Sequence, residues 1–178
     1  MKGDSMDWSA ADPELVKEII REAEAYLQAQ QALALSADQR SSVMASLFTA
    51  TAVAIVAGLM TLLSSERAES HIAIYYGGFF TLVLLVAAAS LCIWSARPVG
   101  FGIVGNEPQS WYDDVRNPRD MTILLGEQAE NYQAQITQNN ARLVSNSIRF
   151  KWGAFIGIAA PIAGLLVWAV AGAKYGFR

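Results

Sequence analysis

The chain has 178 residues, of which 53% are hydrophobic, with 13 basic and 16 acidic side chains. A formal net charge of −3 provides no excess of positive charge, so the composition argues against DNA or RNA as a partner. The single cysteine, Cys92, excludes an intrachain disulfide, and with a single histidine, His71, a zinc site is not expected.

The first forty residues are polar and lack an apolar core of the length that a secretory signal needs, so we expect no cleavage on export. A helix is predicted to begin after Asp12, which acts as its N-cap, with Pro13 at the first helical position. We expect this helix to end near Ala37. Its predicted apolar face recurs at helical spacing and consists of Leu15, Ile19, Ala23, Tyr26, Leu27 and Leu33.

Three uncharged apolar stretches follow, and each is long enough to cross a bilayer as a helix. They comprise residues 43–63, 72–94 and 152–171. The first two are predicted to form a hairpin because only a short loop joins them. The sequence therefore predicts an all-α membrane protein with three transmembrane helices and the lipid bilayer as its environment.

The distribution of Lys and Arg predicts the orientation. Residues 1–42 contain four basic side chains and residues 95–151 contain six, whereas the loop 64–71 contains one and the C-terminal tail two. By the positive-inside rule, the N-terminus and the central segment face the cytosol. We expect a multi-pass protein of the bacterial inner (plasma) membrane, organised as a cytosolic N-terminal helix (1–42), a transmembrane hairpin (43–94), a cytosolic loop and stalk (95–151), and a third span with a short tail (152–178).

A second helix is predicted to start near Pro118 or Asp120 and, from about residue 126, to run as a stalk directly into the third span. Apolar and amide residues recur along it in steps of four and three, the spacing of a heptad seam. The seam consists of Leu125, Ala129, Tyr132, Ile136, Asn139, Leu143, Asn146 and Phe150. Two interpretations remain open: the seam joins copies of the chain in a homo-oligomer, or it packs against the N-terminal helix of the same chain.

Small residues at four-residue spacing favour close approach of membrane helices. They occur in the third span at Gly153, Gly157, Ala160 and Gly164, and in the first at Ala50, Ala54 and Gly58. Packing of the three spans within one chain is the simpler interpretation, and contact between copies is the alternative.

The segment 96–118 is rich in Gly and Pro and is predicted to form a structured loop or short turns. Gly100, Gly102 and Gly105 spell G-x-G-x-x-G, but no strand precedes this motif, so it does not predict a dinucleotide site.

Aromatic and guanidinium groups also gather in or beside this segment, a mixture that suits a nucleotide base and phosphate. The candidate ligand-binding residues are Arg97, Trp111, Tyr112, Arg116 and Arg119. The alternative is an aromatic anchor at the membrane surface.

Nothing in the sequence predicts catalysis. No serine, cysteine or acid pair has a base beside it, and the spans contain no ionisable residue of the kind that marks a proton pathway. We expect no enzyme activity, no catalytic residues, no metal and no cofactor.

The order of these parts resembles the Pycsar transmembrane effector family and, more loosely, the SLATT-type small membrane effectors of bacterial antiphage defence. The resemblance covers residues 15–172. It depends on the step Ala37-Asp38-Gln39-Arg40-Ser41-Ser42 before the hairpin, on Arg97-Pro98 after it, and on the polar helix that leads into the last span.

The resemblance implies an inner-membrane effector that senses a cyclic nucleotide or a partner on its cytosolic face. It further implies that the effector oligomerises and disrupts the membrane of infected cells. The alternative function is a membrane scaffold or regulatory subunit that recruits a partner through its stalk.

Overall fold

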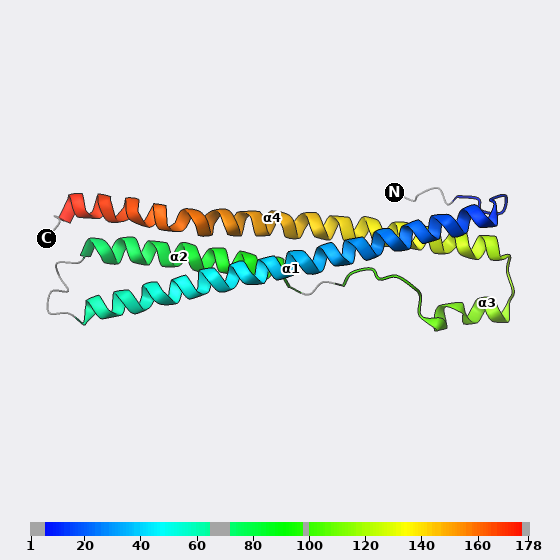
Figure 1. The fold of residues 1–178 in the computed structure, drawn as a ribbon, viewed down its shortest axis with the longest axis horizontal. Helices are drawn as coiled ribbons and strands as arrows, with labels where there is room; N and C mark the ends of the chain where they lie inside the picture. Colours follow the sequence, from blue (N-terminus) through cyan, green and yellow to red (C-terminus); the bar gives the residue numbers. More distant parts are fainter. Residues whose placement is uncertain (1–5, 65–71, 98–99, 176–178) are drawn as a thin grey trace. The chain divides into compact units, whose positions relative to one another are not determined.

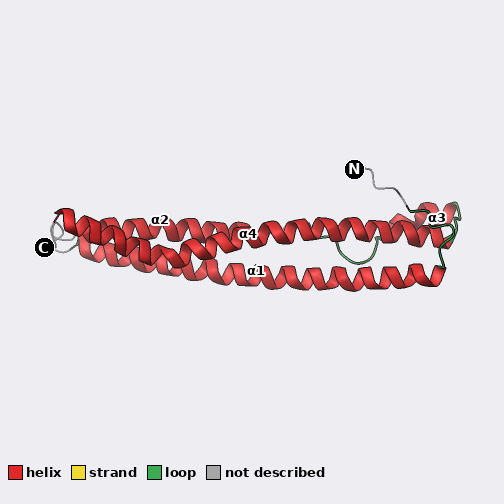
Figure 2. Cartoon of the chain, turned by 90° about the horizontal axis from the view of Figure 1, so that it is seen from above, coloured by secondary structure: helices red, strands yellow, loops and turns green. Residues whose placement is uncertain are grey.

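The structure is a computed structural model that describes residues 6–64, 72–97 and 100–175. Within these ranges all regular secondary structure is helical and no strand occurs (Figure 2). The elements are α1 (Pro13–Leu63), α2 (Ile72–Ser95), the 3-10 helix η2 (Pro108–Trp111), α3 (Tyr112–Arg116) and α4 (Met121–Tyr175). Helices α1, α2 and α4 each contain a stretch long and apolar enough to cross a membrane, which confirms the prediction of three such helices in an all-α protein.

The chain divides into two compact units. The polar unit comprises Met1–Leu35 and Val99–Leu143, and the apolar unit comprises Ser36–Pro98 and Val144–Arg178. Helices α1 and α4 contribute residues to both units, whereas α2 belongs to the apolar unit and α3 to the polar unit (Figure 1).

Both long helices begin at an aspartate N-cap. The Asp12 carboxylate accepts a hydrogen bond of 3.0 Å from the Glu14 amide, and α1 starts at Pro13 as predicted. The Asp120 carboxylate accepts a bond of 2.7 Å from the Thr122 amide at the start of α4. These bonds satisfy amides that have no partner inside the helix. The bonds from Thr122 hold the pKa of Asp120 below its ordinary value.

The predicted end of the first helix near Ala37 is wrong, because α1 continues without a break to Leu63. Residues 38–42 are polar but include no glycine or proline, so nothing in the backbone stops the helix. The polar side chains here are accommodated locally: the Arg40 Nε donates to the Ser36 carbonyl at 3.4 Å, and Ser41 is buried. Polarity alone therefore does not end a helix.

In the polar unit the predicted apolar face of α1 is displaced around the helix. Val16 and Leu27 are fully buried, whereas Leu15 is 57%, Tyr26 51% and Leu33 53% exposed. The buried and half-buried residues recur in steps of four and three, at Val16, Ile20, Ala23, Leu27 and Gln30, rather than on the face that the sequence suggested. A narrow seam suffices because each of these helices buries one side against a single long partner.

The apolar unit is a bundle of α2 with the C-terminal parts of α1 and α4, which lie side by side (Figures 1 and 2). Its core is built mostly from small side chains, among them Ala45, Ala88, Cys92 and Ala160. Small residues allow the helices to approach closely, and dispersion contacts then stabilise the bundle.

The glycines of the third span lie at these close approaches. A Cβ at Gly77 of α2 would lie 2.8 Å from the Gly164 carbonyl oxygen, and one at Gly153 would lie 3.0 Å from the Ala88 carbonyl oxygen. Gly157 faces the ring of Phe48 on α1. The small residues of the third span thus serve packing within the chain.

The small residues of the first span lie elsewhere. Ala50, Ala54 and Gly58 are exposed, and a Cβ at Gly58 would have nothing within 4 Å. This stripe therefore takes no part in the bundle.

Candidate functional site

The centre of the predicted seam lies against α1 of the same chain. Tyr132 is 1% exposed and Asn139 is fully buried. The Tyr132 hydroxyl donates to the Glu24 carboxylate at 2.9 Å, and the Asn139 side-chain amide donates to the Gln30 carbonyl oxygen at 3.2 Å. Tyr132 pairs with Glu24, and Asn139, further along α4, pairs with Gln30, further along α1. Helices α1 and α4 therefore run parallel in the polar unit.

The other seam residues are distributed between the two units. Ala129 is buried and Leu125, Ile136 and Leu143 are half-buried in the polar unit, while Asn146 and Phe150 belong to the apolar unit. A second copy has no access to Tyr132 or Asn139 while these contacts persist. Self-association through the seam stays a prediction, and it would require the polar unit to open.

Residues 100–106, which we name the glycine loop, lie along this seam. The Gly102 amide donates to the Asn139 Oδ1 at 3.0 Å, and the Gly102 carbonyl accepts from the Asn139 Nδ2 at 3.2 Å. Gln31 of α1 also donates to the Gly102 carbonyl at 3.2 Å. One asparagine therefore satisfies both backbone groups of Gly102, and α1 contributes a further bond.

The second anchor of the glycine loop is Tyr132. The Gly105 amide donates to the Tyr132 hydroxyl at 3.0 Å, so this hydroxyl accepts from the loop while it donates to Glu24. Burial raises the pKa of Tyr132, so the phenol remains a neutral donor at physiological pH. Gly105 has a φ of +91°, a backbone conformation that side chains disfavour. Asn106 completes the loop by pairing its side-chain amide with that of Gln128.

Gln30 joins the same network from the α1 side. Its Nε2 donates to the Ile136 carbonyl at 3.2 Å and to the Asn140 Oδ1 at 2.9 Å, while its oxygen accepts from Asn139. We name Gln30, Tyr132 and Asn139, with the Gly102 and Gly105 amides bonded to them, the buried polar layer.

The hydrogen bonds of the glycine loop indicate the role of the G-x-G-x-x-G motif in this chain. In a dinucleotide site the glycine amides are free to meet a pyrophosphate. Here the Gly102 and Gly105 amides are already bonded to Asn139 and Tyr132. A Cβ at Gly102 would lie 2.7 Å from the Gln135 Cβ, so the absence of a side chain at this position allows the loop to pack closely against α4. The motif is structural.

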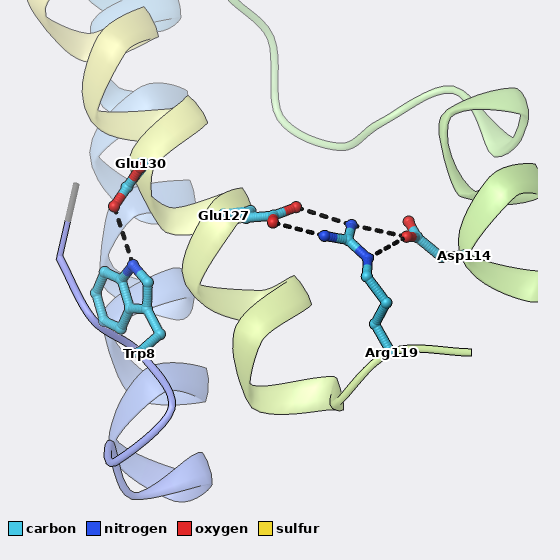
Figure 3. Close-up of polar contacts among 5 residues, drawn as sticks. All are labelled: Trp8, Asp114, Arg119, Glu127 and Glu130. Carbon is cyan, nitrogen blue, oxygen red and sulfur yellow. Dashed lines mark hydrogen bonds and ion pairs between the residues drawn. The ribbon is translucent and has the colours of Figure 1, made fainter. Parts of the chain in front are cut away.

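Arg119 links the short helix α3 to α4 (Figure 3). Its guanidinium donates to the Asp114 carboxylate at 2.8 and 3.0 Å and to the Glu127 carboxylate at 2.7 and 3.0 Å. The hydrogen bonds that Arg119 donates to Glu127 and Asp114 raise the pKa of its guanidinium. A phosphate would have to compete with two carboxylates for this guanidinium.

The residues before α1 fold back onto α4. The Trp8 indole donates to the Glu130 carboxylate at 3.0 Å, as Figure 3 shows. The Trp8 ring also lies against Gly126, where any Cβ would meet the indole. Gly126 is therefore required for this contact.

The five predicted ligand-binding residues belong to different elements, and four of them lie in the polar unit. Trp111, Tyr112 and Arg116 lie on η2 and α3, with Tyr112 56% exposed and Arg116 exposed. Arg119 follows α3 but is paired as described, and Arg97 belongs to the apolar unit.

Sequence reasoning identified Asn139 as a seam amide but missed its partners. Gln30 continues a seven-residue repeat with Val16 and Ala23, all three of which are buried or half-buried. That repeat was the available signal, because an amide within a heptad repeat often lies in the interface. Glu24, Asn106 and Gln128 carry no comparable signal.

Within the described part of the chain, no group of three or more His, Cys, Asp or Glu side chains is placed to hold a metal ion. Comparison of the chain with protein-family models, with curated proteins and with solved structures finds no match. The functional argument therefore depends on the geometry and on the sequence itself.

Proposed function

We propose that this protein is a non-enzymatic membrane effector of the bacterial inner membrane, whose cytosolic polar unit controls the association of its membrane helices. The observation that carries the proposal is the buried polar layer, which joins α1, α4 and the glycine loop. Since α1 and α4 also contribute two of the three helices of the apolar unit, a change in their pairing bears on helices that span the membrane.

A buried polar layer suits a switch because it stabilises the closed form only when every buried donor and acceptor has a hydrogen-bond partner. When every amide has its partner the arrangement is specific, and when one bond is lost the others are left unsatisfied at a cost of about 1–3 kcal/mol each. Opened polar groups can instead be hydrated by water. A ligand that binds the open form more tightly than the closed form would shift the population accordingly.

The signal in this proposal is a cyclic nucleotide or a cytosolic partner, and its source is the resemblance to the Pycsar transmembrane effectors. Half-buried Trp111 and exposed Tyr112 and Arg116 are the part of the predicted site that keeps aromatic faces and an exposed guanidinium on one short segment. We place the ligand there, and oligomerisation follows from opening of the seam.

The proposed effector function is tested by cell growth. Asn139→Ala removes the central member of the polar layer, and the variant should arrest growth on expression without any ligand. Gln138→Ala, an exposed neighbour on the same helix, is the matched control and should leave growth unchanged. Equal growth of both variants, with both present in the membrane fraction, would contradict control by the polar layer.

The ligand is tested separately by calorimetric titration of the purified protein with cyclic mononucleotides. Arg116→Ala is a cleaner probe than Arg119→Ala, because Arg119 also links Asp114 to Glu127. Binding to the parent protein that Arg116→Ala abolishes supports the site. No binding to the parent would exclude cyclic mononucleotides as the signal.

The orientation is tested by cysteine labelling from outside the cell in a Cys92→Ser background. A cysteine at Glu69 should react with an impermeant reagent, and one at the exposed Gln138 should be protected. The reverse pattern would place the polar unit outside the cytosol.

A second candidate function is a scaffold that recruits a cytosolic protein. The specific observation in its favour is the exposed apolar row Leu15, Ile19, Tyr26 and Leu33 on α1. If the protein is a scaffold, the double substitution Leu15→Glu and Leu33→Glu should abolish capture of the partner. Asn139→Ala should then leave growth unaffected.

A further inference from the structure

Basic side chains gather at one end of the apolar unit. Within the apolar unit, Arg40 lies near the start of the α1 part, Arg149 and Lys151 lie near the start of the α4 part, and Arg97 follows the end of α2. These positions come together because the parts of α1 and α4 run parallel and α2 runs antiparallel to them. Among the described residues of the apolar unit, Asp38 is the single acid, and none of the four basic side chains forms an ion pair there. This end carries uncompensated positive charge.

Two of these guanidiniums share one indole. The Arg97 guanidinium carbon lies 5.7 Å from the centre of the Trp94 ring, and that of Arg149 lies 5.4 Å from it. Trp94 itself is 51% exposed. Two hydrogen bonds at Asn146 position these groups. The Ser95 hydroxyl of α2 donates to the Asn146 carbonyl at 2.8 Å, and Arg149 donates to the Asn146 Oδ1 at 3.1 Å.

An apolar groove of about 440 Å³ lies directly beside this cluster. Helices α1 and α2 form it, and its lining includes Thr49, Ser90 and Ile93. Both hydroxyls donate to carbonyls of their own helices, at 2.8 Å each, so neither is left to a ligand. Ile93 lines the groove and directly precedes Trp94 on α2, so the groove reaches the turn of α2 that carries the shared indole.

The geometry points to a binding site for one molecule of an anionic phospholipid, with its phosphate at Arg97 and Arg149 and an acyl chain in the groove between α1 and α2. Guanidiniums are the side chains best suited to phosphate oxygens, and an indole is favoured at the depth of the headgroups. The groove offers hydrocarbon surface and no free donor, which matches an acyl chain and not a soluble phosphate. The site rests on the membrane location of the proposed function but not on its signalling role.

The experiment is native mass spectrometry of the purified full-length protein released from detergent micelles containing phosphatidylglycerol or phosphatidylcholine. The parent should retain phosphatidylglycerol about ten-fold more than phosphatidylcholine. Arg97→Gln and Arg149→Gln should each reduce that retention about ten-fold, since each removes charge-assisted bonds to the phosphate. Lys174→Gln, which removes a charge at the other end of α4, is the matched control and should leave retention unchanged.

The acyl-chain position has its own control pair. Ser90→Phe fills the groove and should reduce retention, whereas Val83→Phe, on an exposed part of α2 outside the groove, should not. Millimolar inorganic phosphate should fail to displace the lipid. Equal retention of the two lipids, equal loss in Lys174→Gln, or displacement by phosphate would each overturn the proposal. Growth arrest plays no part in this measurement, so the lipid site and the effector function fail independently.

Discussion

Replacing Gly77 by alanine tests whether direct backbone contact between α2 and α4 holds the apolar unit together. The added Cβ would lie 2.8 Å from the Gly164 carbonyl oxygen and 2.8 Å from the Trp168 Cβ. Neither atom is the end of a flexible side chain, so the helices themselves must separate. Overpacking of this kind costs about 1–3 kcal/mol.

Gly58→Ala is the matched control, because a Cβ at Gly58 has nothing within 4 Å. Both substitutions gain the same helix propensity, about 1 kcal/mol, so the difference between the two variants isolates the contact. We expect Gly77→Ala to be less stable than Gly58→Ala by about 1–3 kcal/mol. That difference corresponds to a change of about five-fold to over a hundred-fold in the equilibrium for opening.

The assay uses Cys92, the single cysteine, which is fully buried between the helices. The purified protein is titrated with SDS in mixed micelles, and the labelling of Cys92 by a maleimide reports the fraction of opened bundle. Gly77→Ala should be labelled at lower SDS than Gly58→Ala. Coincident curves for the two variants would refute the argument that this glycine contact holds α2 against α4.

Three further predictions concern the polar unit. Asn139→Ala should lower the stability of the unit by about 1–3 kcal/mol relative to Gln138→Ala, because it leaves buried partners unsatisfied; hydrogen exchange along α4 measures this, and equal exchange would contradict it. Asp120 has a lowered pKa, so the stability that its carboxylate gives to the start of α4 is present above its ordinary pKa of about 3.9. This stability is lost as the pH falls through the pKa of the folded protein. Exchange near the start of α4 should therefore rise in acid for the parent but not for Asp120→Asn, which keeps a capping oxygen without titrating, and parallel profiles would refute this. Arg119→Gln should speed proteolysis within residues 107–118 because it breaks both ion pairs that link α3 to α4, whereas Arg116→Gln should not; equal rates would show that the pairs do not hold the segment.

The helices and their starts were largely predictable from the sequence. Apolar length identifies the three stretches that are long enough to cross a membrane, and the N-cap at Asp12 follows from the Asp-Pro pair. The end of the first helix was not predictable from polarity, because a polar stretch such as residues 38–42 remains helical when it includes no glycine or proline.

The polar site was less accessible to sequence reasoning. The heptad spacing identified Asn139, but spacing states only that a partner exists and not which chain supplies it. The partner is Gln30, which lies 109 positions away in sequence. The glycine motif misleads in the same way, since the pattern does not say whether its amides are free, and here Gly102 and Gly105 are bonded to side chains.

The bonding of the glycine loop also provides two natural spectroscopic reporters. The Gly102 and Gly105 amides bond to an asparagine and a tyrosine rather than to another backbone group. Glycine amide nitrogens resonate apart from those of other residues, and this chain has only 13 glycines. In nuclear magnetic resonance spectra of the nitrogen-15-enriched protein, the Gly102 amide signal would therefore report on the bond to Asn139 and the Gly105 amide signal on the bond to Tyr132. No substitution or attached probe is needed.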